Sequence, residues 1–134
     1  MIENILYYLD KENLQSPATK EQIEITQEKM GILLPAEYVD FLLKSNGYEG
    51  SIGESYVAIW NIEELITLND AYEVKEFAPH LILIGSDGGG EAYGFDTRSK
   101  EFPIINTQFI GMGMEDEIVL GHSFNEFIET LYNG

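Results

Sequence analysis

The sequence predicts a single α+β domain with a mostly antiparallel sheet, N-terminal helices and a C-terminal helix packed on it. Three observations lead to this class. Helical patterns lie at both ends of the chain, turn-linked strand patterns fill the middle, and a glycine-rich turn interrupts 81–96 (LILIGSDGGGEAYGFD). At 134 residues the chain can bury roughly two-thirds of its unfolded surface without metals or disulfides. We therefore expect residues 1–134 to form one domain.

The segment 81–96 is the predicted centre of the sheet. Residues 81–84 form an apolar run with the length of a buried strand. Asp87 can accept hydrogen bonds from the backbone that follows it, and the glycines at 88–90 tolerate positive φ angles. Alternation over 91–96 and the apolar residues of 102–105 predict two further strands. The sequence thus favours a three-stranded meander.

The first third of the chain is predicted to be helical. Apolar residues at helical spacing indicate a short amphipathic helix over 2–9. Thr19 opens a capping-box pattern for a second helix, and Gly31 is placed to end it. Pro35 fits the first position of a third helix, which we expect to stop at Asn46 and the glycine after it.

The remaining segments alternate between loops and regular structure. We expect a glycine-rich loop over 47–55, a strand over 56–60, and a helix over 61–75 capped by its first residue. Residues 107–122 are expected to form a loop with at most one short strand. Ser123 provides the cap of a last helix that packs back onto the domain.

The charge of the chain is strongly negative and uneven. There are 24 acidic and 7 basic residues, a net charge of −17, of which −4 falls on 1–47 and −13 on 48–134. Such a field disfavours direct contact with nucleic acid or anionic membranes and attracts a basic partner. Solubility alone is an alternative reason for the charge. The absence of cysteine and of a secretory signal or transmembrane pattern leads us to expect a cytoplasmic protein.

No pattern for catalysis or for a cofactor stands out. The glycine turn lacks the lysine and the helix start of phosphate-binding loops, and Asp87 and Glu91 would repel a phosphate. Together with Asp96 these carboxylates form one candidate for a calcium site, though not at EF-hand spacing, and the acidic run 115–117 is an equal candidate that is more often a solvated run. His80 and His122 have no zinc-site spacing. We therefore predict no cofactor and no metal.

Three segments together resemble a known family: 34–47 (LPAEYVDFLLKSNG), 84–96 (IGSDGGGEAYGFD) and 122–131 (HSFNEFIETL). In this order and spacing the chain, from about residue 20, resembles the SUKH superfamily, which includes fungal cell-wall synthesis regulators and bacterial immunity proteins. The resemblance implies an α+β domain without enzymatic activity that binds and neutralises a cognate toxin domain, often a nuclease. A regulatory module that binds a cell-wall or signalling protein is the alternative.

The acidic half and the segment 107–121, where family members vary, supply the candidate partner-binding residues. The methionines of 112–114 suit an adaptable contact surface, and an exposed edge strand would also permit a homodimer. The candidates are Asp87, Glu91, Glu101, Met112, Met114, Glu115, Asp116 and Glu117.

Overall fold

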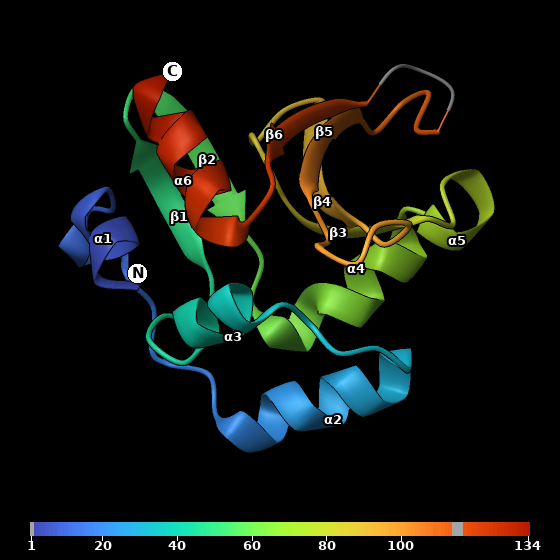
Figure 1. Cartoon of the computed structure of the whole chain (residues 1–134), viewed down its shortest axis with the longest axis horizontal. Helices are drawn as coiled ribbons and strands as arrows, with labels where there is room; N and C mark the ends of the chain where they lie inside the picture. Colours follow the sequence, from blue (N-terminus) through green and yellow to red (C-terminus); the bar gives the residue numbers. More distant parts are fainter. Residues whose placement is uncertain (1, 114–116) are drawn as a thin grey trace.

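The protein is a single α+β domain in which one antiparallel sheet is surrounded by helices (Figure 1). The computed structural model describes residues 2–113 and 117–134. The helices are α1 (Ile2–Tyr7), η1 (Lys11–Asn13), α2 (Lys20–Met30), α3 (Ala36–Leu42), η2 (Ile62–Glu64), α4 (Leu65–Ala71), α5 (Val74–Phe77) and α6 (Phe124–Asn133). The strands are β1 (Tyr48–Ile52), β2 (Ser55–Ile59), β3 (Leu81–Ser86), β4 (Glu91–Asp96), β5 (Ile104–Gln108) and β6 (Ile118–Gly121).

The six strands follow one another in chain order, and every neighbouring pair is antiparallel. Strands β3 to β6 curl into a half-barrel, from which the β1–β2 hairpin diverges (Figure 1). The junction between the two parts is short, because β2 and β3 pair only through Ala58 with Ser86 and Ile59 with Gly85. The amide of Trp60 adds one hydrogen bond of 2.9 Å to the carbonyl of Ile84.

Both faces of the half-barrel formed by β3 to β6 are buried, each by a different set of helices. The larger core joins one face to α1, α2, α3 and α6 and contains the fully buried Tyr38 and Phe95. The smaller core lies on the opposite face, where Val74 of α5 and Met112 cluster with Leu83 of β3. Burial on both sides explains why β3 reads as a continuous apolar run rather than as an alternating one.

Four of the helix ends predicted from the sequence are confirmed, those at Thr19, Gly31, Asn61 and Ser123. Thr19 and Gln22 form a reciprocal capping box, and α2 ends at Gly31 in the left-handed region (φ 71°). The side chain of Asn61 accepts a hydrogen bond from the amide of Glu64, and Ser123 caps α6 in the same way. The meander of β3, β4 and β5 is confirmed too.

Other boundaries were predicted wrongly. The expected loop 47–55 contains β1 and the start of β2, and the expected helix 61–75 is broken at Glu73, whose φ of 55° is incompatible with a continuous helix. The third helix ends at Leu42, four residues early, and Pro35 is its cap rather than its first residue. Of the three turn glycines only Gly88 has a positive φ.

Candidate binding surface

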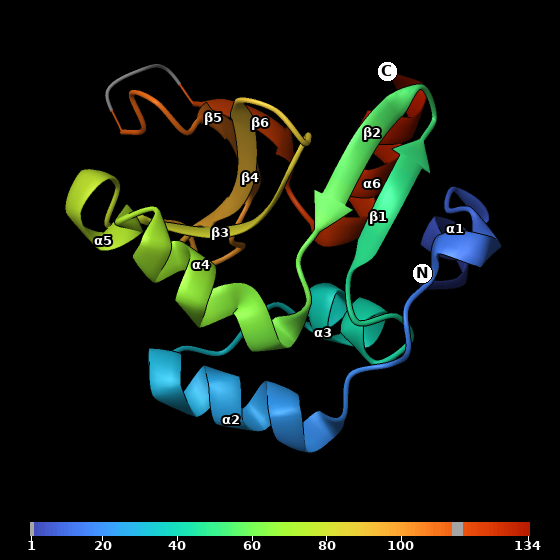
Figure 2. The same ribbon diagram turned by 180° about the vertical axis from the view of Figure 1, so that it is seen from behind.

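The outward side of the β1–β2 hairpin is the open face of the sheet. We use the name hairpin outer face for the cross-strand pairs Glu49 with Ala58 and Ser51 with Tyr56. The alternate residues of the two strands, among them Val57 and Ile59, point the other way into the larger core, which α6 covers. Viewed from behind, the hairpin lies in front of α6 and no helix covers it (Figure 2).

A row of aromatic rings continues from this face. Trp60, directly after β2, stacks on Tyr72 at a centroid distance of 6.1 Å, and Tyr72 stacks on Phe109 at 4.4 Å. Tyr56 is half exposed, and its ring lies against Gly88, where a Cβ atom would come within 2.8 Å of it. Gly88 is thus needed for both its positive φ and this close approach.

A cleft of about 150 Å³ opens beside the hairpin outer face. Its walls come from the segment before β1, the paired ends of β1 and β2, and the start of the following helix. The lining residues are Gln15, Asn46, Tyr48, Glu49, Ala58, Ile59, Trp60, Asn61 and Glu64.

Hydrogen bonds fix the polar walls of this cleft. The side chain of Asn46 accepts from the amide of Ile62 at 2.8 Å and donates to a carboxylate oxygen of Glu63 at 2.6 Å. By contrast, the exposed carboxylates of Glu49 and Glu64 have no hydrogen-bond or ion-pair partner among residues 2–113 and 117–134. The cleft therefore combines rigid amides with two carboxylates whose charge is not compensated.

The Asp87 turn is held together internally. One carboxylate oxygen of Asp87 accepts from the amides of Gly89 at 2.8 Å and Glu91 at 3.2 Å, as the sequence predicted for a turn-forming aspartate. Burial, with the charges of Asp87 and Glu91 nearby, raises the pKa of Tyr93 to about 12. At this turn the carboxylate of Asp87 therefore binds the protein's own backbone, and the charges of Asp87 and Glu91 help to raise the pKa of a core tyrosine.

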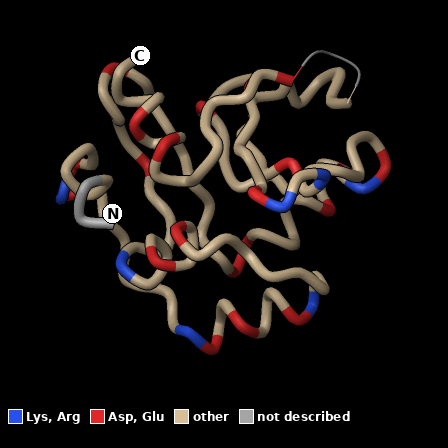
Figure 3. The backbone as a smooth tube through the Cα atoms, viewed as in Figure 1, with Lys and Arg blue, Asp and Glu red and all other residues tan. Residues whose placement is uncertain are grey.

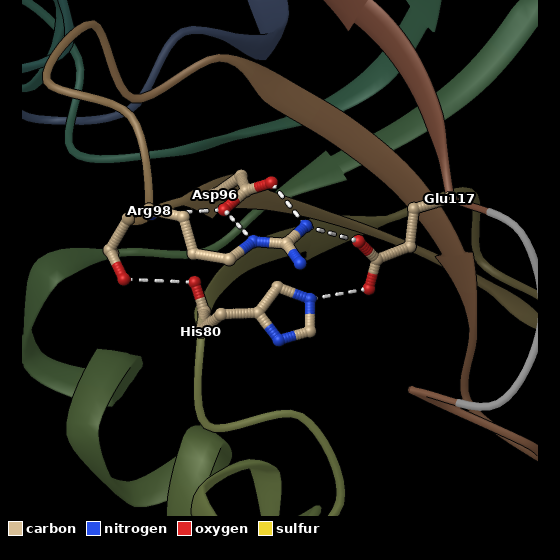
Figure 4. A network of polar contacts seen from close by, with 5 residues as sticks. His80, Asp96, Arg98 and Glu117 are labelled. Carbon is tan, nitrogen blue, oxygen red and sulfur yellow. Dashed lines mark hydrogen bonds and ion pairs between the residues drawn. The ribbon is translucent and has the colours of Figure 1, made fainter.

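A polar network links three segments that are far apart in the sequence (Figure 4). Arg98 donates two hydrogen bonds to the carboxylate of Asp96, at 3.0 and 2.7 Å, and a third to Glu117 at 3.3 Å. The second oxygen of Glu117 lies 2.7 Å from Nε2 of His80, which precedes β3. The hydrogen bonds from Arg98 hold the pKa of Asp96 below its ordinary value, and Asp96 in turn raises the pKa of Arg98. The network therefore anchors the start of β6 to the start of β3 and the end of β4.

The structure does not bring the predicted partner-binding residues into one patch. Glu91 begins β4 and Glu101 follows its far end, so about 17 Å of strand separates the two positions. Glu101 is exposed and lies 3.8 Å from His122, whereas Glu117 belongs to the polar network. Met112 is 3 % exposed in the smaller core and offers no free contact surface. The candidates outside the described residues are Met114, Glu115 and Asp116.

The calcium-site hypothesis fails on the same geometry. Asp96 pairs with Arg98 at the end of β4 opposite to Glu91, so the three proposed carboxylates do not converge. Among the described side chains, those of residues 5–113 and 117–134, no three His, Cys, Asp or Glu are grouped as a metal site would require. No helix in those residues is long and apolar enough to cross a membrane.

Sequence reasoning missed both the cleft and the polar network. The sequence predicts a loop at Glu49, so nothing placed it in one cleft with Trp60 and Glu64. His80 and Glu117 are 37 residues apart, and no local spacing connects them. The available sequence signal for the cleft was that the segment between Lys44 and Lys75 contains acidic residues but no lysine or arginine.

Comparison with known proteins gives the family of this chain. A profile of the SMI1/KNR4 family (SUKH-1) matches residues 17–130. The chain belongs to this family. The SUKH-1 chain is also 28% identical over 121 residues to the uncharacterised protein YnaB of Bacillus subtilis (strain 168). The aligned region covers 89% of this chain and 79% of YnaB. The match extends through the Asp87 turn and the polar network.

Proposed function

We propose that this SUKH-1 protein is an immunity protein, which binds a basic toxin domain of the nuclease type and blocks its active surface without catalysing any reaction. Family membership supports a protein-binding role, since the resemblance to immunity proteins extends over most of the chain. The charge supports a basic partner, because carboxylates steer cationic surfaces into contact and raise the association rate.

The observation that carries this proposal is that most of the acidic side chains described have no basic partner within the chain. Among the side chains of residues 5–113 and 117–134, ion pairs involve only three acids: Asp96, Glu101 and Glu117. The backbone trace coloured by charge shows acidic residues and no Lys or Arg on β1 and α6 (Figure 3), and β2 contains no charged residue. The field of these elements is therefore available to an approaching partner.

The proposed contact acids include those expected from the sequence. Glu91 and Glu101 would contribute at the two ends of β4, with Glu115 and Asp116 as further candidates from the variable segment. Asp87 and Glu117 already have partners within the chain and would contribute mainly through their long-range charge. Shape and apolar contacts would then set the residence time of the complex.

The first test is capture of partners on the tagged protein from its native host, at about 0.15 M salt and again at high salt, where charge attraction is screened. The proposal expects one basic toxin domain that is released at high salt, and relief of its growth inhibition when the SUKH-1 protein is co-expressed. Recovery of a cell-wall or signalling protein instead, without any toxin, would favour the regulatory alternative.

The second test measures association with that toxin domain directly. Neutralising Glu91, Glu101, Glu115 and Asp116 together should slow association by roughly tenfold at low salt and flatten its salt dependence. A control variant with three neutralised acids on α2, Glu21, Glu24 and Glu28, has a similar change in net charge. Equal slowing in both variants would show that overall charge, and not these acids, is responsible.

A further inference from the structure

We infer that the cleft beside the hairpin outer face is a recognition site for one arginine side chain of the protein partner. This inference rests on the proposed function, because it names where and how a basic partner is held. Its evidence is independent of the candidate acids of 87–117 and comes from the volume, lining and charge of the cleft.

The volume limits the occupant to a single side chain. Sites for small molecules and cofactors measure about 300–1,000 Å³, whereas this cleft has about 150 Å³. A nucleotide or a drug-sized ligand is too large for it. The head group and terminal methylenes of one long side chain are of the right scale.

The lining determines the charge of that side chain. Glu49 and Glu64 provide carboxylates without partners in the described residues, and no lysine or arginine lines the cleft. Six acids and no base lie between Lys44 and Lys75 in the sequence. A cation entering here meets no competing positive charge, so anionic and neutral ligands are disfavoured.

The remaining lining residues favour guanidinium over ammonium. Guanidinium is planar, presents five donors in a fixed arrangement, stacks on aromatic rings and is weakly hydrated. The cleft offers acceptors of matching type in the two carboxylates and in the side-chain amide oxygen of Gln15. Trp60 lines it as well, and tryptophan is the strongest partner for cation–π contacts.

The cleft is also pre-formed, which lowers the entropy cost of binding. Asn46 is fixed by Ile62 and Glu63, and Trp60 is held from outside by its stacking on Tyr72. A Cβ atom at Gly47 would lie 2.6 Å from the carbonyl oxygen of Ile59, so glycine is required where this wall meets the hairpin. These contacts exist without any partner present.

The test uses the single tryptophan of the chain as its reporter. Because Trp60 gives the only indole N–H signal in a ¹H–¹⁵N correlation spectrum, that signal reports on the cleft. The probe is N-acetyl-Gly-Arg-Gly-amide, compared with peptides in which lysine or the uncharged isostere citrulline replaces arginine. We expect a saturable shift of the Trp60 signal with a dissociation constant on the order of 1 mM for the arginine peptide.

Two charge-matched variants separate the cleft from the general acidic field. Glu49→Gln with Glu64→Gln should weaken binding of the arginine peptide by roughly tenfold. Glu24→Gln with Glu28→Gln, on the exposed side of α2, changes the net charge equally and should leave binding within about twofold. All four residues are exposed, so an unchanged melting temperature verifies that each variant is folded.

Three results would overturn the inference: an equal response to the citrulline peptide, equal binding of the lysine peptide, or equal weakening in the two double variants. Partner capture with the wild-type protein and the Glu49/Glu64 double variant separates this inference from the proposed function. If both proteins capture the basic toxin domain equally and the arginine peptide does not bind, only the inference fails. If neither captures a basic partner, the proposed function fails, whatever the peptide does.

Discussion

Replacing Tyr38 with phenylalanine should stabilise the protein. Tyr38 is fully buried between Phe95 and Phe124, and its hydroxyl has no hydrogen-bond partner in the described part of the chain. A buried hydroxyl without a partner costs about 1–3 kcal/mol. The gap left by one oxygen atom costs only a few tenths of a kcal/mol at about 24 cal/mol per Å³. Tyr38→Phe should therefore raise the free energy of unfolding by about 1–2 kcal/mol.

The same substitution should alter how stability depends on pH. Burial raises the pKa of Tyr38 above its ordinary value of 10.0. The unfolded chain therefore loses this proton near pH 10 while the folded chain keeps it, so the contribution of Tyr38 is complete below pH 10 and is lost as the pH rises further. The loss approaches about 1.4 kcal/mol for each pH unit. The advantage of Tyr38→Phe should accordingly be about 1.4 kcal/mol larger at pH 11 than at pH 8.

Urea unfolding at the two pH values, followed by far-UV circular dichroism, measures both effects. Tyr7→Phe is the matched control, because Tyr7 is 82% exposed and its loss should change stability by less than about 0.5 kcal/mol. If Tyr38→Phe destabilised the protein at pH 8, the hydroxyl would have a partner and the reasoning would be refuted. An advantage that did not grow between pH 8 and pH 11 would refute the assignment of the raised pKa.

Three further substitutions test the contacts that hold the sheet in place, each by urea unfolding. Asn69→Ala removes a side chain that bonds both the amide and the carbonyl of Leu83, at 2.8 and 2.9 Å, and should cost about 2–4 kcal/mol. Arg98→Gln should cost less than about 1 kcal/mol at neutral pH, because Arg98 is 63% exposed. Since Arg98 lowers the pKa of Asp96, this cost is present above pH 3.8 and fades as the pH falls through the folded pKa. Gly85→Ala places a Cβ atom against the backbone of β2 at the short junction and should cost about 3 kcal/mol.

Each of these substitutions has a matched control in the chain. Asn133→Ala removes an exposed asparagine side chain without a hydrogen-bond partner in the described residues, and Gly90→Ala adds a Cβ atom that meets nothing within 4 Å. Lys100→Gln removes an exposed cation that has no ion pair in those residues. If a control and its test variant lost equal stability, the named contact would not be the cause. A cost of Arg98→Gln that persisted at pH 2 would contradict the role assigned to Asp96.

The sequence predicted those parts of the fold that depend on local contacts. The capping box at Thr19, the left-handed Gly31 and the turn at Asp87 each need only residues within about four positions of one another. The β1 strand was missed because its glycine serves a tertiary contact. Gly50 lies directly against the side chain of Asn13, which would have to move to admit a Cβ atom, whereas composition alone treats such a glycine as part of a loop.

The candidate site was less predictable, for a related reason. Met112 lies between two glycines and has the pattern of an exposed, adaptable residue, yet the second face of the sheet needs apolar cover and buries it. Glu117 was expected to face a partner, but His80 and Arg98 reach it once β3, β4 and β6 are assembled. Whether an acidic residue serves structure or binding depends on these long-range neighbours, and a single sequence does not show them.

The location of unpaired charge, rather than its total, decides where a basic partner should bind. At physiological salt the field of an exposed charge decays over about 8 Å, so a partner responds to the acids near its point of contact and only weakly to the net charge of −17. Three of the four ion pairs in the described residues lie in the network around Glu117, where Arg98 already supplies positive charge. The hairpin outer face and its cleft have Glu49, Glu64 and no base. A partner guided by the local electrostatic potential should therefore dock at the hairpin, while the acids along β4 mainly raise its association rate.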